Sequence, residues 1–128
     1  MSRGVTHRSG DVGWNGKMLY KINFGRIIPS NGTQYFGFVA SCDGTIVSFP
    51  VTITTQLTNA AAALQLGTEA SKTSLLANLD IHSYTAGVYN LLSNLAATSL
   101  TAGVAYVFSV IDGDTTGLLT AGLVVEPR

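Results

Sequence analysis

The sequence is poor in the residues that carry chemistry. One cysteine, Cys42, and two histidines, His7 and His82, occur in 128 residues. A single cysteine excludes an intrachain disulfide, which fits folding in a reducing compartment. We interpret Cys42 as a buried structural residue, because a reactive thiol needs a nearby base or cation and the adjacent charged residue is the acid Asp43.

Charged residues are also scarce, at 11% of the chain against about 25% in an average protein. The net charge of zero hides an asymmetry: residues 1–26 hold five basic residues and one acidic residue, whereas residues 27–128 hold two basic and six acidic ones. A free monomer normally keeps more surface charge for solubility. We therefore expect a neutral surface that packs against copies of the chain or a partner. A soluble monomer with a threonine-rich surface is the alternative.

Long apolar runs are absent. No run approaches the roughly 18 residues that a membrane span needs, and the amino-terminal residues Met-Ser-Arg-Gly are polar. We therefore expect no signal peptide and no membrane as a partner.

The motifs of common enzymes are missing too. The sequence has no Walker loop, dinucleotide fingerprint or G-x-S-x-G elbow. Asp80 and His82 fall on one face of a predicted strand, but two ligands do not make a metal site. Asp112 and Asp114 are better explained by turn chemistry than as paired catalytic carboxylates or calcium ligands. We predict that the protein is not an enzyme and uses no cofactor or metal.

Residues 1–17 show neither a strand period nor a helical period, and their four glycines and basic residues predict an extended arm. Trp14 is predicted to anchor this arm on a partner, because tryptophan is enriched at interface hot spots. Folding of Trp14 back onto its own domain is the alternative. Five basic residues spread over 26 make a poor nucleic-acid patch, so direct nucleic-acid binding is not expected. The predicted partner-binding residues are Arg3, Arg8, Trp14 and Lys17.

Residues 18–128 are predicted to form one β-sandwich domain, because short alternating segments are separated by turn signals. About seven strands are expected, at residues 18–28, 33–41, 45–55, 73–81, 87–93, 104–111 and 118–126. The first strand should turn four side chains inward: Tyr20, Ile22, Phe24 and, at the rim, Arg26. The strand at 73–81 should place four on one face: Leu75, Ala77, Leu79 and Ile81. Residues 57–72 remain open between a short helix capped by Asn59 and an irregular crossover.

Turn dipeptides mark several strand joints: Asn31-Gly32, Asp43-Gly44 and Asp112-Gly113. Asn-Gly and Asp-Gly favour hairpins, because glycine accepts the positive φ that a tight hairpin turn requires. We therefore predict hairpins at these joints, including one between the last two strands. Pro50 cannot donate a hydrogen bond to a neighbouring strand, so it marks an edge or a bulge.

Four segments of the carboxyl-terminal half carry a family resemblance. They are the G-x-Y of Gly87-Val88-Tyr89, the L-x-x-G-x-x-Y of Leu100-Thr101-Ala102-Gly103-Val104-Ala105-Tyr106, the acidic turn Asp112-Gly113, and the V-V-x-P of Val124-Val125-Glu126-Pro127. The resemblance spans residues 83–128, about a third of the chain. The pattern resembles small immunoglobulin-like domains in structural proteins of tailed bacteriophages. The resemblance implies an immunoglobulin-like antiparallel β-sandwich that serves as a capsid decoration, tail, fibre or baseplate component.

The low charge, the expected lack of an export signal and the basic arm agree with this resemblance. We favour a non-enzymatic capsid decoration, or cement, protein that is attached through its arm and assembled in the host cytoplasm. Its expected partners are copies of itself and a major capsid or other virion protein. One alternative is a tail-fibre or baseplate component. Another is a carbohydrate- or surface-binding module that uses Tyr35, Tyr84 or Tyr89 as a platform. A hydrolase built on Asp80 and His82 is the least favoured reading.

Overall fold

The computed structural model describes residues 18–29, 32–111 and 117–128. These residues form ten strands and one 3-10 turn, Leu92–Asn94. The strands are β1 (Tyr20–Ile27), β2 (Thr33–Val39), β3 (Gly44–Ser48), β4 (Pro50–Thr55), β5 (Ala63–Thr68), β6 (Leu76–Asp80), β7 (Gly87–Asn90), β8 (Ser99–Leu100), β9 (Ala105–Ile111) and β10 (Leu118–Pro127). The all-β prediction is confirmed. The count exceeds seven because the strand expected at 45–55 divides before Pro50, and because β5 and β8 are additional.

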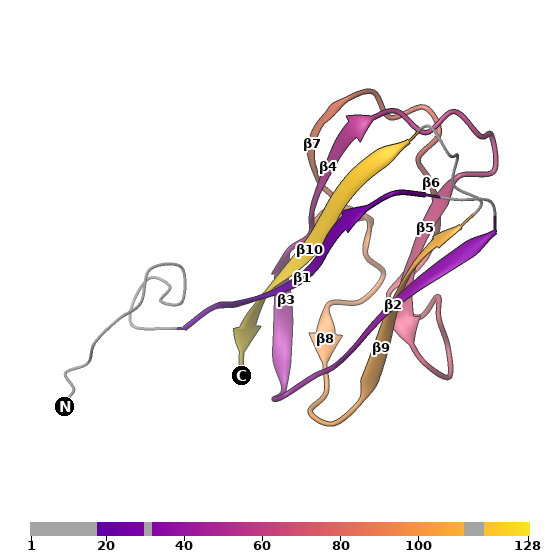
Figure 1. Cartoon of the computed structure of the whole chain (residues 1–128). Coiled ribbons are helices and arrows are strands. Elements are labelled where there is room, and N and C mark those ends of the chain that lie inside the picture. Colours follow the sequence, from indigo (N-terminus) through magenta and orange to yellow (C-terminus); the bar gives the residue numbers. More distant parts are fainter. Residues whose placement is uncertain (1–17, 30–31, 112–116) are drawn as a thin grey trace.

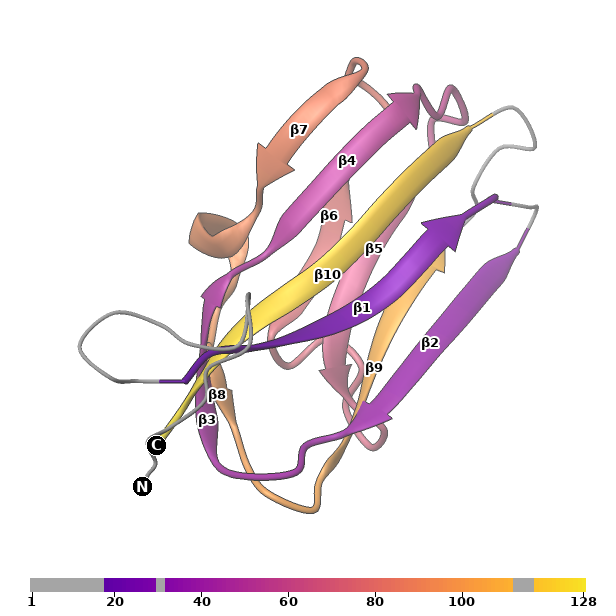
Figure 2. The ribbon, with the colours of Figure 1, turned by 60° about the vertical axis from the view of Figure 1, so that its left-hand side comes forward.

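The strands form two antiparallel sheets that face each other (Figure 1). One sheet has the order β7-β4-β10-β3-β8, with β1 also paired to β10, and the other has the order β2-β9-β5-β6. β10 is the central strand of the larger sheet, since it pairs with β1, β3 and β4. Figure 2 shows β1 and β2 next to each other at one side of the sandwich, with β7 at the opposite side.

The core between the sheets is built around aromatic rings. Phe49 and Phe108 are the largest fully buried side chains. The ring of Phe108, on β9, stacks on Phe24 of β1 with centroids 4.8 Å apart, and it meets Phe49 edge-on at 5.9 Å. Because Phe108 belongs to one sheet and its two partners to the other side of the core, these contacts join the two layers.

The predicted hairpins are wrong at all three joints. The strands that flank each joint, β1 and β2, β2 and β3, and β9 and β10, lie in different sheets. Asn31 and residues 112–116 themselves lie outside the described residues. A turn dipeptide reverses the chain, but burial of the apolar faces decides which sheet the next strand enters. β5 and β6 do form a hairpin.

A bulge in β1 changes the predicted faces. The register with β10 shifts between Asn23 and Gly25, and Gly25 has a φ of +79°. The Gly25 N–H donates to Asn23 Oδ1 at 2.8 Å. Arg26 was predicted to turn inward but is exposed, because the bulge gives the buried position to Ile27. Three side chains do pack against the core as predicted: Tyr20, Ile22 and Phe24.

Residues 57–72 form neither a helix nor an irregular crossover, because their centre is strand β5, paired between β6 and β9. Asn59 caps no helix, and its Oδ1 instead accepts a hydrogen bond from the Ala61 N–H at 2.9 Å. Leu64 and Leu66 are fully buried. Burial within a sheet outweighs the weak helical preference of the alanines before it.

The predicted face of residues 73–81 is also only partly correct. Leu75 and Ile81 are buried, but Ala77 is exposed and Leu76 is buried in its place. Asn78, with a φ of +33°, interrupts the regular alternation. Alternation alone does not predict such a break.

Residues 100–106 form a corner between the two sheets. Leu100 is buried, Gly103 has a φ of +80°, and the Thr101 N–H donates to the Tyr106 hydroxyl at 2.8 Å. A tyrosine hydroxyl that bonds back to the backbone a few residues upstream is the tyrosine corner of immunoglobulin-like sandwiches. The L-x-x-G-x-x-Y motif thus has a structural reason. In those domains the last two strands share a sheet, whereas β9 and β10 do not. The two-sheet sandwich is therefore confirmed, and the immunoglobulin-like assignment stays a prediction.

Candidate interaction surfaces

The predicted partner-binding residues belong to the amino-terminal arm. Arg3, Arg8, Trp14 and Lys17 all lie outside the described residues, so their role stays a prediction. The described part of the chain offers a polar network, a pair of tyrosines, a hollow on one sheet and an exposed edge strand. The described part contains no helix of membrane-spanning length and apolarity.

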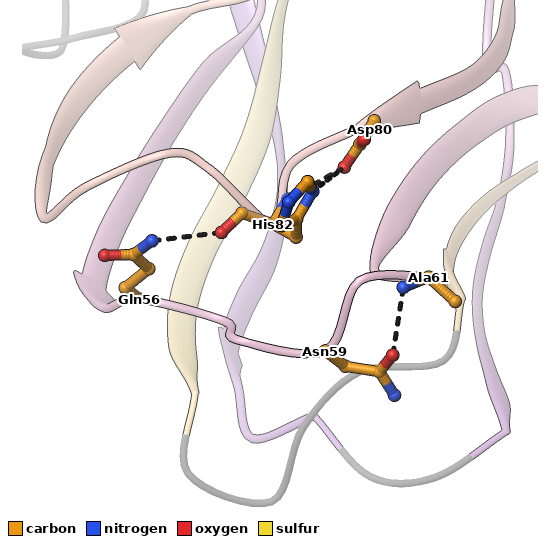
Figure 3. A network of polar contacts seen from close by, with 5 residues as sticks. All are labelled: Gln56, Asn59, Ala61, Asp80 and His82. Carbon is orange, nitrogen blue, oxygen red and sulfur yellow. Dashed lines mark hydrogen bonds and ion pairs between the residues drawn. The ribbon is translucent and has the colours of Figure 1, made fainter.

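The polar network lies where β6 ends (Figure 3). Asp80 Oδ1 is 2.7 Å from His82 Nδ1 and accepts a second hydrogen bond from the His82 N–H at 3.0 Å. These bonds, first from the ring and then from the backbone, hold the pKa of the Asp80 carboxyl below its usual value. Gln56 Nε2 donates to the His82 carbonyl at 3.0 Å and ties this turn to the segment after β4.

The pair of Asp80 and His82 therefore does form, as its spacing predicts. Both side chains are substantially exposed, at 60% and 42%. No group of three or more histidine, cysteine or acidic residues that could hold a metal occurs in the described ranges. The two bonds stabilise the turn that follows β6, and this structural role accounts for the pair.

The tyrosines considered as a carbohydrate platform do not share one surface. Tyr84 and Tyr89 lie together with ring centroids 4.8 Å apart, half-buried against the core. The Tyr89 hydroxyl donates to the Thr85 carbonyl at 2.7 Å. Tyr35 instead lies on β2 of the other sheet, with Lys72 Nζ 5.9 Å from its ring centroid. Tyr84 and Tyr89 pack against each other and Tyr35 lies on the other sheet, so the three do not form one platform, and carbohydrate binding by any of them stays a prediction.

A hollow of about 280 Å³ lies on the larger sheet. Glycine at position 122, in its lining, lets β1 lie close to β10, since a Cβ there would come 2.9 Å from the Ile22 carbonyl oxygen. The volume falls just below the roughly 300–1,000 Å³ of typical ligand pockets. The hollow carries two threonine hydroxyls and one charged side chain, that of Lys21. It is lined by Lys21, Ile22, Asn23, Pro50, Thr52, Thr120, Ala121, Gly122, Leu123 and Val124.

The edge strand β2 carries the most exposed apolar side chains of the smaller sheet. Tyr35 is 60% exposed and Val39 is 63% exposed, while Phe36 and Phe38 on the opposite face pack against the core. Sequence reasoning missed Val39 and this strand as an interaction surface. The signal was present: the strand Thr33–Val39 has no charged residue and carries large apolar side chains at both odd and even positions.

Cys42 is half-buried rather than buried. Its Sγ lies 3.9 Å from the Tyr20 hydroxyl. Burial, followed by the contact with Cys42, raises the pKa of Tyr20. The contact joins the segment after β2 to the start of β1.

No family model and no curated protein matches the sequence. Among solved structures, a chain in the acidic stable capsid structure of Helicobacter pylori bacteriophage KHP30 is similar, with 14% sequence identity and a TM-score of 0.58. The match covers 84% of this chain and 86% of that chain. A chain of the cyanophage Pam1 capsid asymmetric unit has 9% identity and a TM-score of 0.44, with coverage of 100% and 98%. The first likeness shows a shared sandwich fold.

Proposed function

We propose that this protein is a non-enzymatic structural component of a virion, and specifically a capsid decoration protein held by its basic arm. The observation that carries the proposal is the likeness to the KHP30 capsid chain. That likeness spans 84% of this chain and 86% of the other. A sandwich of comparable extent therefore occurs as a chain in a phage capsid structure, which supports the same use here.

The surface supports the proposal as well. The lining of the hollow on the larger sheet includes one charged residue, Lys21, and β2 presents uncharged side chains. Such surfaces form hydrogen bonds and apolar contacts without the cost of desolvating many charges. In this proposal the sandwich supplies a rigid body, the arm supplies attachment, and the neutral surfaces pack against copies of the chain or a capsid protein.

Binding to virus heads tests the proposal. Heads of the virus that encodes the protein would be prepared without it, and purified protein would then be added and co-sedimented. We expect saturable binding to heads, and loss of binding when residues 1–17 are deleted, with an unchanged far-UV circular dichroism spectrum. Binding to isolated tails instead of heads would favour the tail-fibre or baseplate alternative.

A matched set of charge variants sharpens the test of the arm. The triple variant Arg3→Gln, Arg8→Gln and Lys17→Gln should weaken binding and its salt dependence, and Trp14→Ala should weaken binding at all salt concentrations. Lys72→Gln removes a basic residue of the sandwich and is the control, with unchanged binding expected. Equal binding by the full-length and truncated proteins would contradict the role of the arm.

A further inference from the structure

The two long edge strands of the sandwich differ in their protection. In the described part of the chain β1 pairs with β10 alone and β2 pairs with β9 alone. Each therefore leaves one row of backbone N–H and C=O groups without a strand partner. Proteins normally protect such an edge with charges, prolines or bulges. β1 has all but the proline, through Lys21, Arg26 and the bulge at Gly25.

β2 has none of these protections. Its sequence, TQYFGFV, contains no charge and no proline. Its register with β9 runs without a shift from the pair Thr33 and Ile111 to the pair Val39 and Ala105. It is therefore straight, regular and long enough to act as a template for another strand.

We propose that β2 pairs antiparallel with β2 of a second copy of the chain, so that two four-stranded sheets join across a twofold axis. A twofold centred on Phe36 places Tyr35 opposite Gly37 of the second copy, on the outer face. Gly37 is exposed, and a Cβ there would meet one atom within 4 Å, the Tyr106 carbonyl oxygen at 3.5 Å. The space above Gly37 is thus open for a tyrosine ring, and aromatic residues opposite edge glycines are a known stabilising pair.

The inner face of β2 fits the same register. Phe36 would lie opposite its own equivalent, and Gln34 opposite Phe38 of the second copy. Both phenylalanine rings are half-buried and pack against the core. A second strand would cover more of these rings, which adds apolar burial to the backbone hydrogen bonds.

Charge explains why a second copy would choose β2 over β1. β2 contributes no charge, so a twofold contact along it brings no like charges together. The same contact along β1 would bring Lys21 and Arg26 towards the basic residues of the other copy, and like charges across strands are destabilising. This inference concerns association between copies and does not depend on the virion role.

Sedimentation velocity of the full chain tests the inference without any virus component. A concentration series from about 1 μM to about 1 mM covers weak to moderate affinities. We expect a monomer–dimer equilibrium in the wild type. In the proposed register Thr33 lies opposite Val39 of the second copy, and both are exposed. The double variant Thr33→Lys with Val39→Lys creates two repulsive pairs and should raise the dimer Kd at least about tenfold.

A second double variant tests the register itself. Thr33→Glu with Val39→Lys puts opposite charges across both pairs and should keep the dimer near wild-type affinity. Val88→Lys is the matched control, since Val88 is 77% exposed on the edge strand β7; it should leave the dimer unchanged. A wild type that stays monomeric throughout overturns the inference. So does a dimer that Thr33→Lys with Val39→Lys leaves intact, or one that both double variants dissociate equally.

Discussion

β1 and β2 are neighbours in the chain and in space, yet each closes the edge of a different sheet. Both carry large apolar side chains, and both pack rings against Phe108. They differ in charge and regularity: Lys21, Arg26 and the bulge at Gly25 belong to β1, and β2 is uncharged and unbroken. In a chain with 11% charged residues, two charges and one bulge thus distinguish the protected edge from the unprotected one.

The largest effect is expected from removing the Phe108 ring, which contacts both edge strands. Phe108→Ala should lower the free energy of unfolding by about 3–5 kcal/mol, because the ring is fully buried between Phe24 and Phe36. Urea unfolding followed by circular dichroism measures the loss. Val88→Ala, at an exposed site, should change stability by less than about 0.5 kcal/mol. A loss of under about 1 kcal/mol for Phe108→Ala would show that the ring is not the common support.

The next largest effect is a difference in stability between alanine substitutions of the glycine in β1 and the glycine in β2. Gly25→Ala should cost about 1–2 kcal/mol, because its φ of +79° is strained for a residue with a side chain even though nothing lies within 4 Å. Gly37 lacks a positive φ and has only an ordinary contact at 3.5 Å. Gly37→Ala should therefore change stability by less than about 0.5 kcal/mol. Unfolding is measured at low protein concentration so that only the monomer contributes. Equal decreases in the free energy of unfolding for the two variants would contradict the expected difference between the edges.

A smaller effect concerns the pH dependence of β1. Burial, then the contact with Cys42, raises the pKa of Tyr20 above its ordinary value of 10.0. The folded state therefore favours the neutral phenol. That contribution is fully present below the ordinary pKa and is lost as the pH rises through the folded pKa. The free energy of unfolding should fall as the pH is raised from below 10 to above it. Tyr20→Phe should make this decline smaller. Tyr35→Phe, the matched substitution on β2, should leave it in place.

The smallest effect concerns the exposed ring of β2. Lys72 Nζ lies 5.9 Å from the centroid of Tyr35, and an exposed cation–π contact contributes about 0.5–1 kcal/mol. Lys72 also lies 3.6 Å from the Glu69 carboxylate. A double-mutant cycle with Lys72→Met and Tyr35→Leu separates the two, since the coupling energy belongs to the ring contact alone. A coupling of zero would mean that Lys72 acts through Glu69.

The sequence predicts the strands of this sandwich better than their partners. Residues 87–90, 105–111 and 118–127 form strands close to where the sequence places them, and β10 shows the clear alternation of a strand that buries one face. The pairing partners of a strand depend on non-local packing. The turn dipeptides therefore predicted hairpins at joints where the chain instead passes from one sheet to the other. β5 was missed because buried residues occur on both of its faces, and such a strand loses the hydrophobic period of two.

The candidate surfaces were predictable to a lesser degree. The arm residues lie outside the described part of the chain, so the structure neither supports nor contradicts them. The pair of Asp80 and His82 was found because its members are two residues apart, although only Asp80 lies on β6 and His82 follows in the turn. The grouping of tyrosines was not predictable, because Tyr35 and Tyr89 belong to different sheets. The exposed edge at β2 depends on which strand lies at the end of a sheet, which is a property of the whole topology.

The central position of β10 has a consequence for biosynthesis. β10 pairs with β1 near the start of the described chain, with partners as distant as Tyr20 and Val125. It also separates β1 from β3 and β4. Until β10 has emerged from the ribosome, the larger sheet has no centre, and the inner edges of β1, β3 and β4 stay open. The domain must therefore complete its folding after β10 has emerged, at the slow rate of non-local strand pairing. During that interval nascent chains are exposed to mispairing with one another.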